Sequence, residues 1–219
     1  MGFSKKRTGA FYLTNLLLTA VLFVVLFFLI DGKIISGRYV NLITLVCVNV
    51  ILAVSLNLVT GILGQLVLGH AGFMLVGAYV SALFTKNVGM ALGLSFPISL
   101  VLAGLVAALF GVLIGIPALR LRGDYLAIIT LGFGEIIRVL ANAEFLKPIT
   151  NGAMGLGDIP TLYNRRTSPA GLFVYAFIIM VLVIVINFSF GRSRHGRAVI
   201  AIREDEIAAE SAGIHTTYY

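Results

Sequence analysis

The chain has little of what soluble enzymes and secreted scaffolds depend on. Only 11% of its 219 residues are charged, and it has a single cysteine, Cys47. Ordinary soluble domains have about 25% charged residues. One cysteine cannot form an intramolecular disulfide, and no cysteine pair stands at metal-ligand spacing, so we expect neither a disulfide scaffold nor a metal site.

Sequence motifs for catalysis are also missing. The chain has no G-x-x-x-x-G-K-[ST] phosphate loop and no H-E-x-x-H motif, and its histidines, His70, His195 and His215, are far apart in sequence. We therefore expect no enzymatic activity and no cofactor bound by this chain. Any energy input has to come from another subunit.

Apolar residues dominate instead. They make up 59% of the sequence, which places the chain in a lipid bilayer. The formal net charge of +7 would suggest nucleic-acid binding in a soluble domain. Here, however, the basic residues stand mainly at the ends of apolar runs, where they set orientation, so no nucleic-acid partner is expected.

Apolar runs long enough to cross a bilayer recur along the chain. About 20 such residues are needed for one spanning helix. The pattern predicts an all-α, polytopic membrane helix bundle of about six spans, one of them a glycine-rich segment that is broken or re-entrant. The predicted spans are Ala10 to Ile30, Tyr39 to Leu58, the broken segment Gly61 to Phe84, Ser95 to Leu119, Asp124 to Phe145 and Gly171 to Phe190.

Basic residues near the helix ends predict the orientation. Lys5, Lys6 and Arg7 precede the first span, and Arg192, Arg194 and Arg197 follow the last one. Because such residues are retained on the cytoplasmic side, we expect a cytoplasmic N-terminus. This divides the chain into a transmembrane region, residues 1–190, and a cytoplasmic segment, residues 191–219.

Two polar side chains stand in the broken segment. Gln65 and His70 lie where unwound backbone and helix ends can recognise a small zwitterion, as in other carriers. Both residues are candidates for the substrate path. Hydrogen bonding between helices is an equal alternative for both.

Glu135 and Arg138 form a second candidate for the substrate path. They stand three residues apart in the middle of a span, on one helix face, where a charged residue is costly unless it is paired and turned toward the bundle interior. One interpretation places them beside the path. The other makes them a self-satisfied pair that fixes how helices dock.

Small residues recur every fourth position in the span from Ser95 to Leu119. Ala103, Ala107, Gly111 and Gly115 form one flat stripe, against which another helix is expected to pack closely.

The charged end of the chain predicts a short helix. It extends from Ala198 through Arg203 to a C-terminal stop at Gly213, with a polar face and small residues at Ala208 and Ala209 that permit close contact with another surface.

Four stretches together carry a family resemblance. The chain resembles the LivM-type permeases of branched-chain amino-acid ABC importers through LNLVTGILGQLVLGHAGFMLVGAY (Leu56 to Tyr79), LRGDYLAIITLGFGEIIRVL (Leu121 to Leu140), TNGAMGLGDIP (Thr150 to Pro160) and GRAVIAIREDEIAAESAGI (Gly196 to Ile214).

The resemblance implies a membrane permease of the inner (plasma) membrane that moves leucine, isoleucine or valine inward. Its implied partners are a second, homologous permease, two cytoplasmic ATPases that bind and hydrolyse ATP, and an extracytoplasmic substrate-binding protein. The tail resembles the coupling loop of such importers, in which E-A-A-x-x-x-G contacts the ATPase. Ala208, Ala209 and Gly213 keep this spacing, whereas Ile207 stands in the position of the glutamate and Glu206 lies one residue earlier.

Two alternatives stay open. Related permeases serve several solutes, so the substrate could be urea or another small amide. Permeases of this kind also continue past the coupling loop, whereas this chain stops six residues beyond Gly213. We therefore expect a truncated chain, and the second alternative is a membrane fragment that does not transport.

Overall fold

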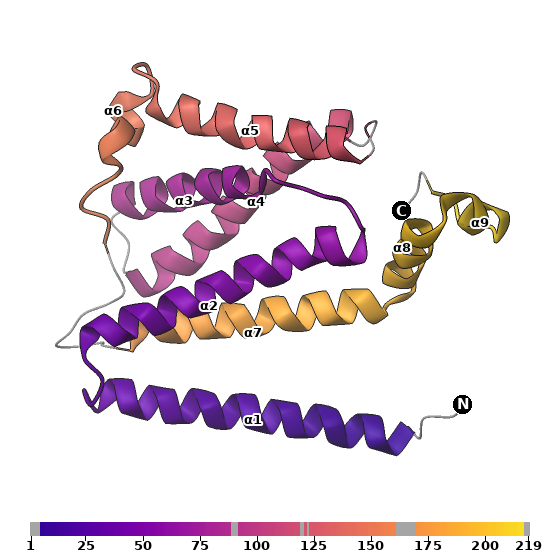
Figure 1. The fold of residues 1–219 in the computed structure, drawn as a ribbon. Helices are drawn as coiled ribbons and strands as arrows, with labels where there is room; N and C mark the ends of the chain where they lie inside the picture. Colours follow the sequence, from indigo (N-terminus) through magenta and orange to yellow (C-terminus); the bar gives the residue numbers. More distant parts are fainter. Residues whose placement is uncertain (1–4, 89–91, 119–120, 122, 161–169, 217–219) are drawn as a thin grey trace. The chain divides into compact units, whose positions relative to one another are not determined.

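The computed structural model describes residues 5–88, 92–118, 121, 123–160 and 170–216, and within these ranges every regular element is a helix (Figure 1). The side chains of residues 5–13, and so of Lys5, Lys6 and Arg7, lie outside the described part. The helices are α1 (Lys5–Asp31), α2 (Gly37–Asn57), the π-helix η1 (Leu58–Ile62), α3 (His70–Asn87), α4 (Leu92–Ala118), α5 (Asp124–Asn142), α6 (Lys147–Thr150), the 3₁₀ helix η2 (Gly152–Met154), α7 (Gly171–Arg192), α8 (Arg194–Glu204) and α9 (Glu206–Ser211).

The helices confirm an all-α membrane protein. In the described residues, 4 helical segments are long and apolar enough to cross a bilayer: Thr14–Asp31, Gly37–Ile62, Gly93–Ala118 and Gly171–Arg192. A bent pair, Asp124–Asn142 with Lys147–Met154, raises the number to 5. Each of the six predicted spans coincides with a helix, but α3 is shortened to 18 residues because the chain before it is not helical.

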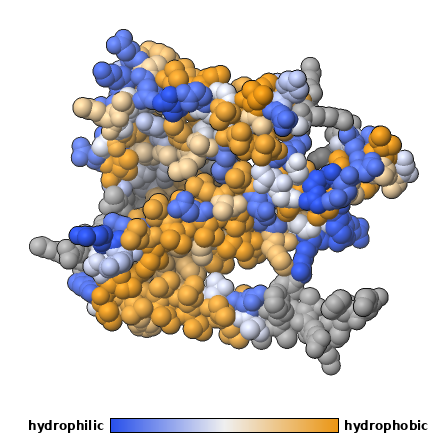
Figure 2. Space-filling view, in the orientation of Figure 1, coloured by the Kyte–Doolittle hydropathy of each residue, from blue (hydrophilic) through white to orange (hydrophobic). Residues whose placement is uncertain are grey.

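Apolar side chains cover much of the molecular surface. Figure 2 shows them along the helices, with hydrophilic residues gathered mostly near helix ends. Leu17, Leu105 and Ile186 are examples that are more than half exposed. Such a surface is stable only against lipid or other apolar protein.

The chain folds into two compact units, Met1–Ile51 with Leu162–Val183 and Leu52–Thr161 with Ile184–Tyr219. The first unit contains α1 and the first parts of α2 and α7. Its core is built around Phe173, which is fully buried, and Ile30, which is 1% exposed. The Phe23 ring stacks on Phe173 at 6.1 Å between centroids, and Phe177 lies 5.6 Å from Phe173.

The second unit is built by close approach of glycine-containing helices. A Cβ atom added at Gly72 of α3 would lie 2.9 Å from the Gly134 Cα of α5. The rings of Phe73 and Phe133 meet beside this contact, with centroids 5.0 Å apart. The α3 helix also packs against α4. Because Gly72 and Gly134 have no side chains, α3 and α5 can approach each other this closely.

The tail differs from its prediction as a single helix. It forms α8 and α9, which are separated by Asp205 in an extended conformation (φ −157°, ψ 110°). The Asp205 carboxylate accepts a hydrogen bond from the Ala208 amide at 3.0 Å and so caps α9. A short acidic side chain that bonds to the backbone favours a new helix start over continuation of the old one.

Candidate functional site

The candidate site is the interruption between α2 and α3. After Asn57 the helix widens into η1, where the Leu63 amide bonds to the Leu58 carbonyl at 3.1 Å. Gly64 then adopts a left-handed conformation (φ 73°) that ends the helix. Such π-type turns are rare and occur frequently at functional sites.

Residues 63–69 are non-helical but not without backbone partners. The Gln65 amide donates to the Val59 carbonyl at 3.1 Å, and the Leu68 amide donates to the Thr130 Oγ1 of α5 at 3.1 Å. The Thr130 hydroxyl in turn donates to the Ala127 carbonyl at 3.0 Å. Irregular backbone is tolerated at membrane depth only where protein or water satisfies it, and here α5 supplies a partner.

Gly69 brings the segment against α5. A Cβ atom at this position would lie 2.1 Å from the Thr130 carbonyl oxygen. Only glycine permits this distance, because the obstructing atom belongs to the backbone and cannot rotate away. The end of the interruption is therefore fixed on α5 by a hydrogen bond and a glycine contact at neighbouring positions.

His70 begins α3 and faces the end of α2. Its Nε2 lies 3.2 Å from the Ser55 Oγ. The only hydroxyl hydrogen of Ser55 is directed to the Leu52 carbonyl, 2.9 Å away. With that hydrogen on the Leu52 carbonyl, Ser55 accepts from His70 in the tautomer that carries its hydrogen on Nε2. Both side chains are half-buried, so the bond joins the two sides of the interruption.

The Gln65 side chain is half-buried in the same segment. The structure thus places Gln65 and His70 on the two ends of one short non-helical stretch. Glycine density predicted this interruption from the sequence.

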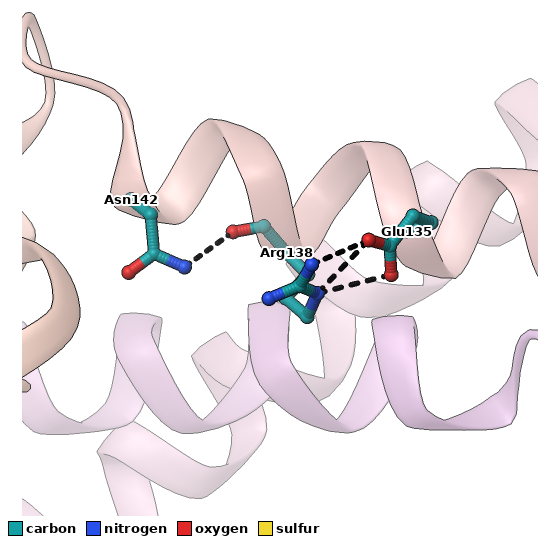
Figure 3. A network of polar contacts seen from close by, with 3 residues as sticks. All are labelled: Glu135, Arg138 and Asn142. Carbon is teal, nitrogen blue, oxygen red and sulfur yellow. Dashed lines mark hydrogen bonds and ion pairs between the residues drawn. The ribbon is translucent and has the colours of Figure 1, made fainter.

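Glu135 and Arg138 form the predicted ion pair on α5. Figure 3 shows the Arg138 guanidinium directed at the Glu135 carboxylate, with Nη2 to Oε1 at 2.5 Å and Nε to Oε2 at 3.0 Å. Asn142 extends the row by donating to the Arg138 carbonyl at 2.9 Å. This forked arrangement fixes the guanidinium more firmly than a single bond would.

The ion pair and the interruption use different faces of α5. Thr130 is buried on the face toward residues 68–69, whereas the Glu135 and Arg138 side chains are 57% and 60% exposed. From the sequence we expected this pair to face the bundle interior. In this chain the pair is exposed instead. A charged pair on the open side of an apolar helix needs protein or a wet cavity next to it in the membrane.

The stripe of small residues on α4 lies on its less exposed side. Ala103 is 7% exposed, and a Cβ atom at Gly77 of α3 would be 4.0 Å from its carbonyl oxygen. A Cβ atom at Gly111 would be 3.9 Å from the Phe73 ring. Ala107 and Gly115 are half-buried on the same side.

Gly213 ends α9 as predicted. It has φ 84°, its amide bonds to the Glu210 carbonyl at 2.9 Å, and the Ile214 amide bonds to the Ala209 carbonyl at 3.0 Å. These two bonds form a Schellman motif with Gly213 at C′. Of the candidate coupling residues, Ala208 is exposed, Glu206 is half-buried and Ala209 is 4% exposed.

Three residues that matter to this arrangement were not identified from the sequence: Ser55, Thr130 and Arg203. Ser55 and Thr130 stand in apolar spans, where a hydroxyl group usually bonds to its own helix. Arg203 donates to the Gly61 carbonyl. Their partners are far away in sequence, and periodicity carries no signal for such pairs.

A shallow groove lies near the interruption. It has a volume of about 360 Å³ and is lined by Val54, Asn57, Ile62, Ile184, Asn187, Phe188, Gly191 and Arg192. The Arg192 guanidinium lies 4.3 Å from the centre of the Phe188 ring. The lining of the groove is mostly apolar.

Together, the spanning helices and the interrupted helix held against a neighbour define a polytopic α-helical membrane protein. Residues 38–219 match the family described as the permease component of branched-chain amino acid transport systems. Because this match covers more than half of the chain, the chain belongs to that family. The resemblance found in the four sequence stretches is thereby confirmed.

Two curated relatives are similar to it. The chain is 39% identical over 173 residues to the high-affinity branched-chain amino acid transport system permease protein LivM of Salmonella typhimurium, covering 66% of this chain and 39% of that protein. It is 39% identical over 170 residues to LivM of Escherichia coli, covering 65% and 38%. The match thus spans about two fifths of the length of these relatives. No solved structure matches the chain.

Proposed function

We propose that the chain is a permease subunit of an ABC importer of the inner membrane that moves branched-chain amino acids into the cell. The family match over residues 38–219 carries this proposal. The names of the two relatives, high-affinity branched-chain amino acid transport system permease proteins, point to leucine, isoleucine and valine as substrates. In this proposal ATP is hydrolysed by partner ATPases, beside a second permease and a binding protein that delivers the substrate.

The proposed orientation has residues 1–190 in the membrane and residues 191–219 in the cytoplasm. Contacts within the second unit agree with the sides that basic residues predict. With a cytoplasmic N-terminus and six spans, Lys86 after the third span and the connection after the fifth span both lie outside. Lys86 donates to the Gly157 carbonyl of that connection at 3.1 Å. At the other side, Arg203 of the tail binds Gly61 at the end of the α2–η1 helix.

The proposed ATPase contact is the exposed side of α9. Ile207 is 79% exposed although it is apolar, and Ala208 next to it is exposed and small. Ala209, in contrast, supports α9 from within. An ATPase would thus contact Ile207 and Ala208, with Glu206 and Gly213 at the ends of the helix.

The test is copurification of the ATPases with the chain carrying Ile207→Arg and Ala208→Arg together. We expect the amount of bound ATPase to fall about tenfold or more, since a loss of roughly 1.4 kcal/mol of binding free energy has that effect. Met154→Arg is the control, because it adds an arginine at a side chain that is 90% exposed and lies far from α9 in the sequence. Unchanged copurification of the double variant would remove the coupling role.

Substrate choice needs a separate assay. Uptake of labelled leucine by the assembled transporter should be competed by isoleucine and valine and not by urea. Competition by urea alone would assign the chain to the transport of small amides.

A further inference from the structure

The contact between Arg203 and the interruption is the strongest feature that the proposed function has not used. Arg203 stands at the end of α8, and its Nη1 donates to the Gly61 carbonyl in η1, 142 positions away in sequence. The Nε of the same guanidinium donates to Glu204 Oε1 at 3.1 Å, and Nη2 binds that oxygen as well. The guanidinium is therefore held by its neighbour while it binds a distant backbone group.

The Gly61 carbonyl is available because the helix ends there. The last carbonyls of a helix have no intrahelical donors. In this helix the Leu63 and Gln65 amides bond to the carbonyls of Leu58 and Val59. A cation at a helix C-terminus is favoured by the helix dipole, so Arg203 caps the interrupted helix from another element.

Gly64 makes room for the Arg203 side chain. A Cβ atom at Gly64 would lie 2.4 Å from the Arg203 Cγ and 2.6 Å from its Cδ. The aliphatic part of Arg203 thus lies across the backbone at the residue whose positive φ ends the helix. Two features three residues apart therefore accommodate the same arginine: the Gly61 carbonyl accepts its hydrogen bond, and Gly64 has no side chain that would collide with it.

The same end of α8 continues directly into α9. The two helices are separated only by Asp205, which caps α9 through the Ala208 amide. In the opposite direction, residues 65–69 follow Gly64 and reach Thr130 and His70, where the interruption is fixed. A continuous row of contacts therefore joins the proposed ATPase surface to the proposed substrate path.

We propose that Arg203 is the positioning residue that ties α8 to the end of the α2–η1 helix, and that movement of α9 reaches residues 61–69 through it. The direction of this coupling, from an ATPase to the membrane, rests on the proposed function. The contact between Arg203 and the end of the α2–η1 helix does not depend on that function.

The first measurement is hydrogen exchange of the full chain in lipid nanodiscs, followed by mass spectrometry. In Arg203→Ala, amides in residues 63–69 should exchange about tenfold faster or more, since local opening there loses a stabilising contact. Arg197→Ala is the matched control, because Arg197 stands on the same helix but donates to the Arg192 carbonyl at 2.9 Å. Exchange in residues 63–69 that stays unchanged in Arg203→Ala, or rises equally in Arg197→Ala, would overturn the tie.

Arg203→Lys is a second variant that keeps the test valid if Arg203→Ala does not fold. Lysine keeps the charge near the helix end but lacks the forked donors that bind Glu204 and Gly61 together, so exchange between the wild-type and Arg203→Ala rates is expected. If Arg203→Ala does not yield folded protein, wild-type exchange in Arg203→Lys would contradict the proposal.

The second measurement separates the tie from the proposed function. In the assembled transporter, Arg203→Ala should keep ATPase copurification and lose about tenfold or more of leucine uptake, whereas Arg197→Ala should keep both. Normal uptake together with faster exchange would overturn the role of Arg203 in coupling. Failure of the wild-type chain to bind an ATPase would refute the proposed function and leave the exchange result standing.

Discussion

The two compact units of the chain are held by different kinds of contact. In the first unit, aromatic and aliphatic side chains fill the core around Phe173. Two described polar side chains of this unit bond within their own helix: Thr44 donates to the Val40 carbonyl at 2.9 Å, and Asn49 donates to the Leu45 carbonyl at 3.0 Å. Polar side chains of this kind satisfy themselves within one helix and do not hold two helices together.

In the second unit, polar side chains reach other elements. His70 forms a hydrogen bond with Ser55, and the Thr130 hydroxyl accepts a hydrogen bond from the Leu68 amide. The Ser81 hydroxyl of α3 and the Ser99 hydroxyl of α4 lie 3.0 Å apart. Ser99 also donates to the Phe96 carbonyl within α4 at 2.8 Å. Glycine contacts bring the same elements together.

This difference has a mechanical meaning. A core of interlocking rings can be loosened only by losing packing over a wide area. Single hydrogen bonds across helices are worth about 1 kcal/mol each, and they can be exchanged for others at little cost. Under the proposed function, the first unit is suited to anchor the subunit, and the second unit is suited to change shape.

The largest effect is expected in the core of the first unit. Phe173→Ala should lower the free energy of unfolding by about 3–5 kcal/mol, because Phe173 is fully buried and its ring contacts would be replaced by a cavity. Reversible unfolding in mixed detergent micelles measures this value. Phe28→Ala is the control: Phe28 is 69% exposed, and its loss should have little effect. Equal losses in both variants would show that this unit has no packed core.

A smaller effect is expected where glycine sets the distance between helices of the second unit. Gly69→Ala should destabilise the protein by about 1–3 kcal/mol, because the added methyl group meets the Thr130 backbone at 2.1 Å. Gly77→Ala, 4.0 Å from its nearest neighbour atom, should be tolerated. The same unfolding measurement compares them, and a tolerated Gly69→Ala would contradict the close contact.

The sequence predicted what depends on local pattern. Lengths of apolar runs located the helices, and spacing of three residues paired Glu135 with Arg138. Glycine density predicted a broken segment from Gly61 to Phe84, of which residues 63–69 are the non-helical part. Gly213 was identified as the residue that ends α9 because left-handed conformations favour glycine.

Pairs that are distant in sequence could not be predicted in this way. Leu68 and Thr130 are 62 positions apart, and no periodicity relates them. The division of the tail at Asp205 was missed for another reason: aspartate within a charged helical pattern has the same composition whether or not its carboxylate caps a new helix. The exposed face of Glu135 and Arg138 depends on which side of α5 packs on α3, and Thr130 and Gly134 decide that through contacts outside the helix.

The smallest effect gives the sharpest comparison between the units, because it removes the same atom from each. Thr130→Val leaves the Leu68 amide without its acceptor and should cost about 1–2 kcal/mol, whereas Thr44→Val removes only a bond within α2 and should cost less than about 0.5 kcal/mol. Both threonines are buried, at 5% and 8% exposure, so differences in solvation do not confuse the comparison. Hydrogen exchange at Leu68 should rise only in Thr130→Val. If the two substitutions cost the same, bonds between elements contribute no more to the second unit than local bonds do to the first, and the contrast between an anchoring and a deformable unit would have to rest on glycine contacts alone.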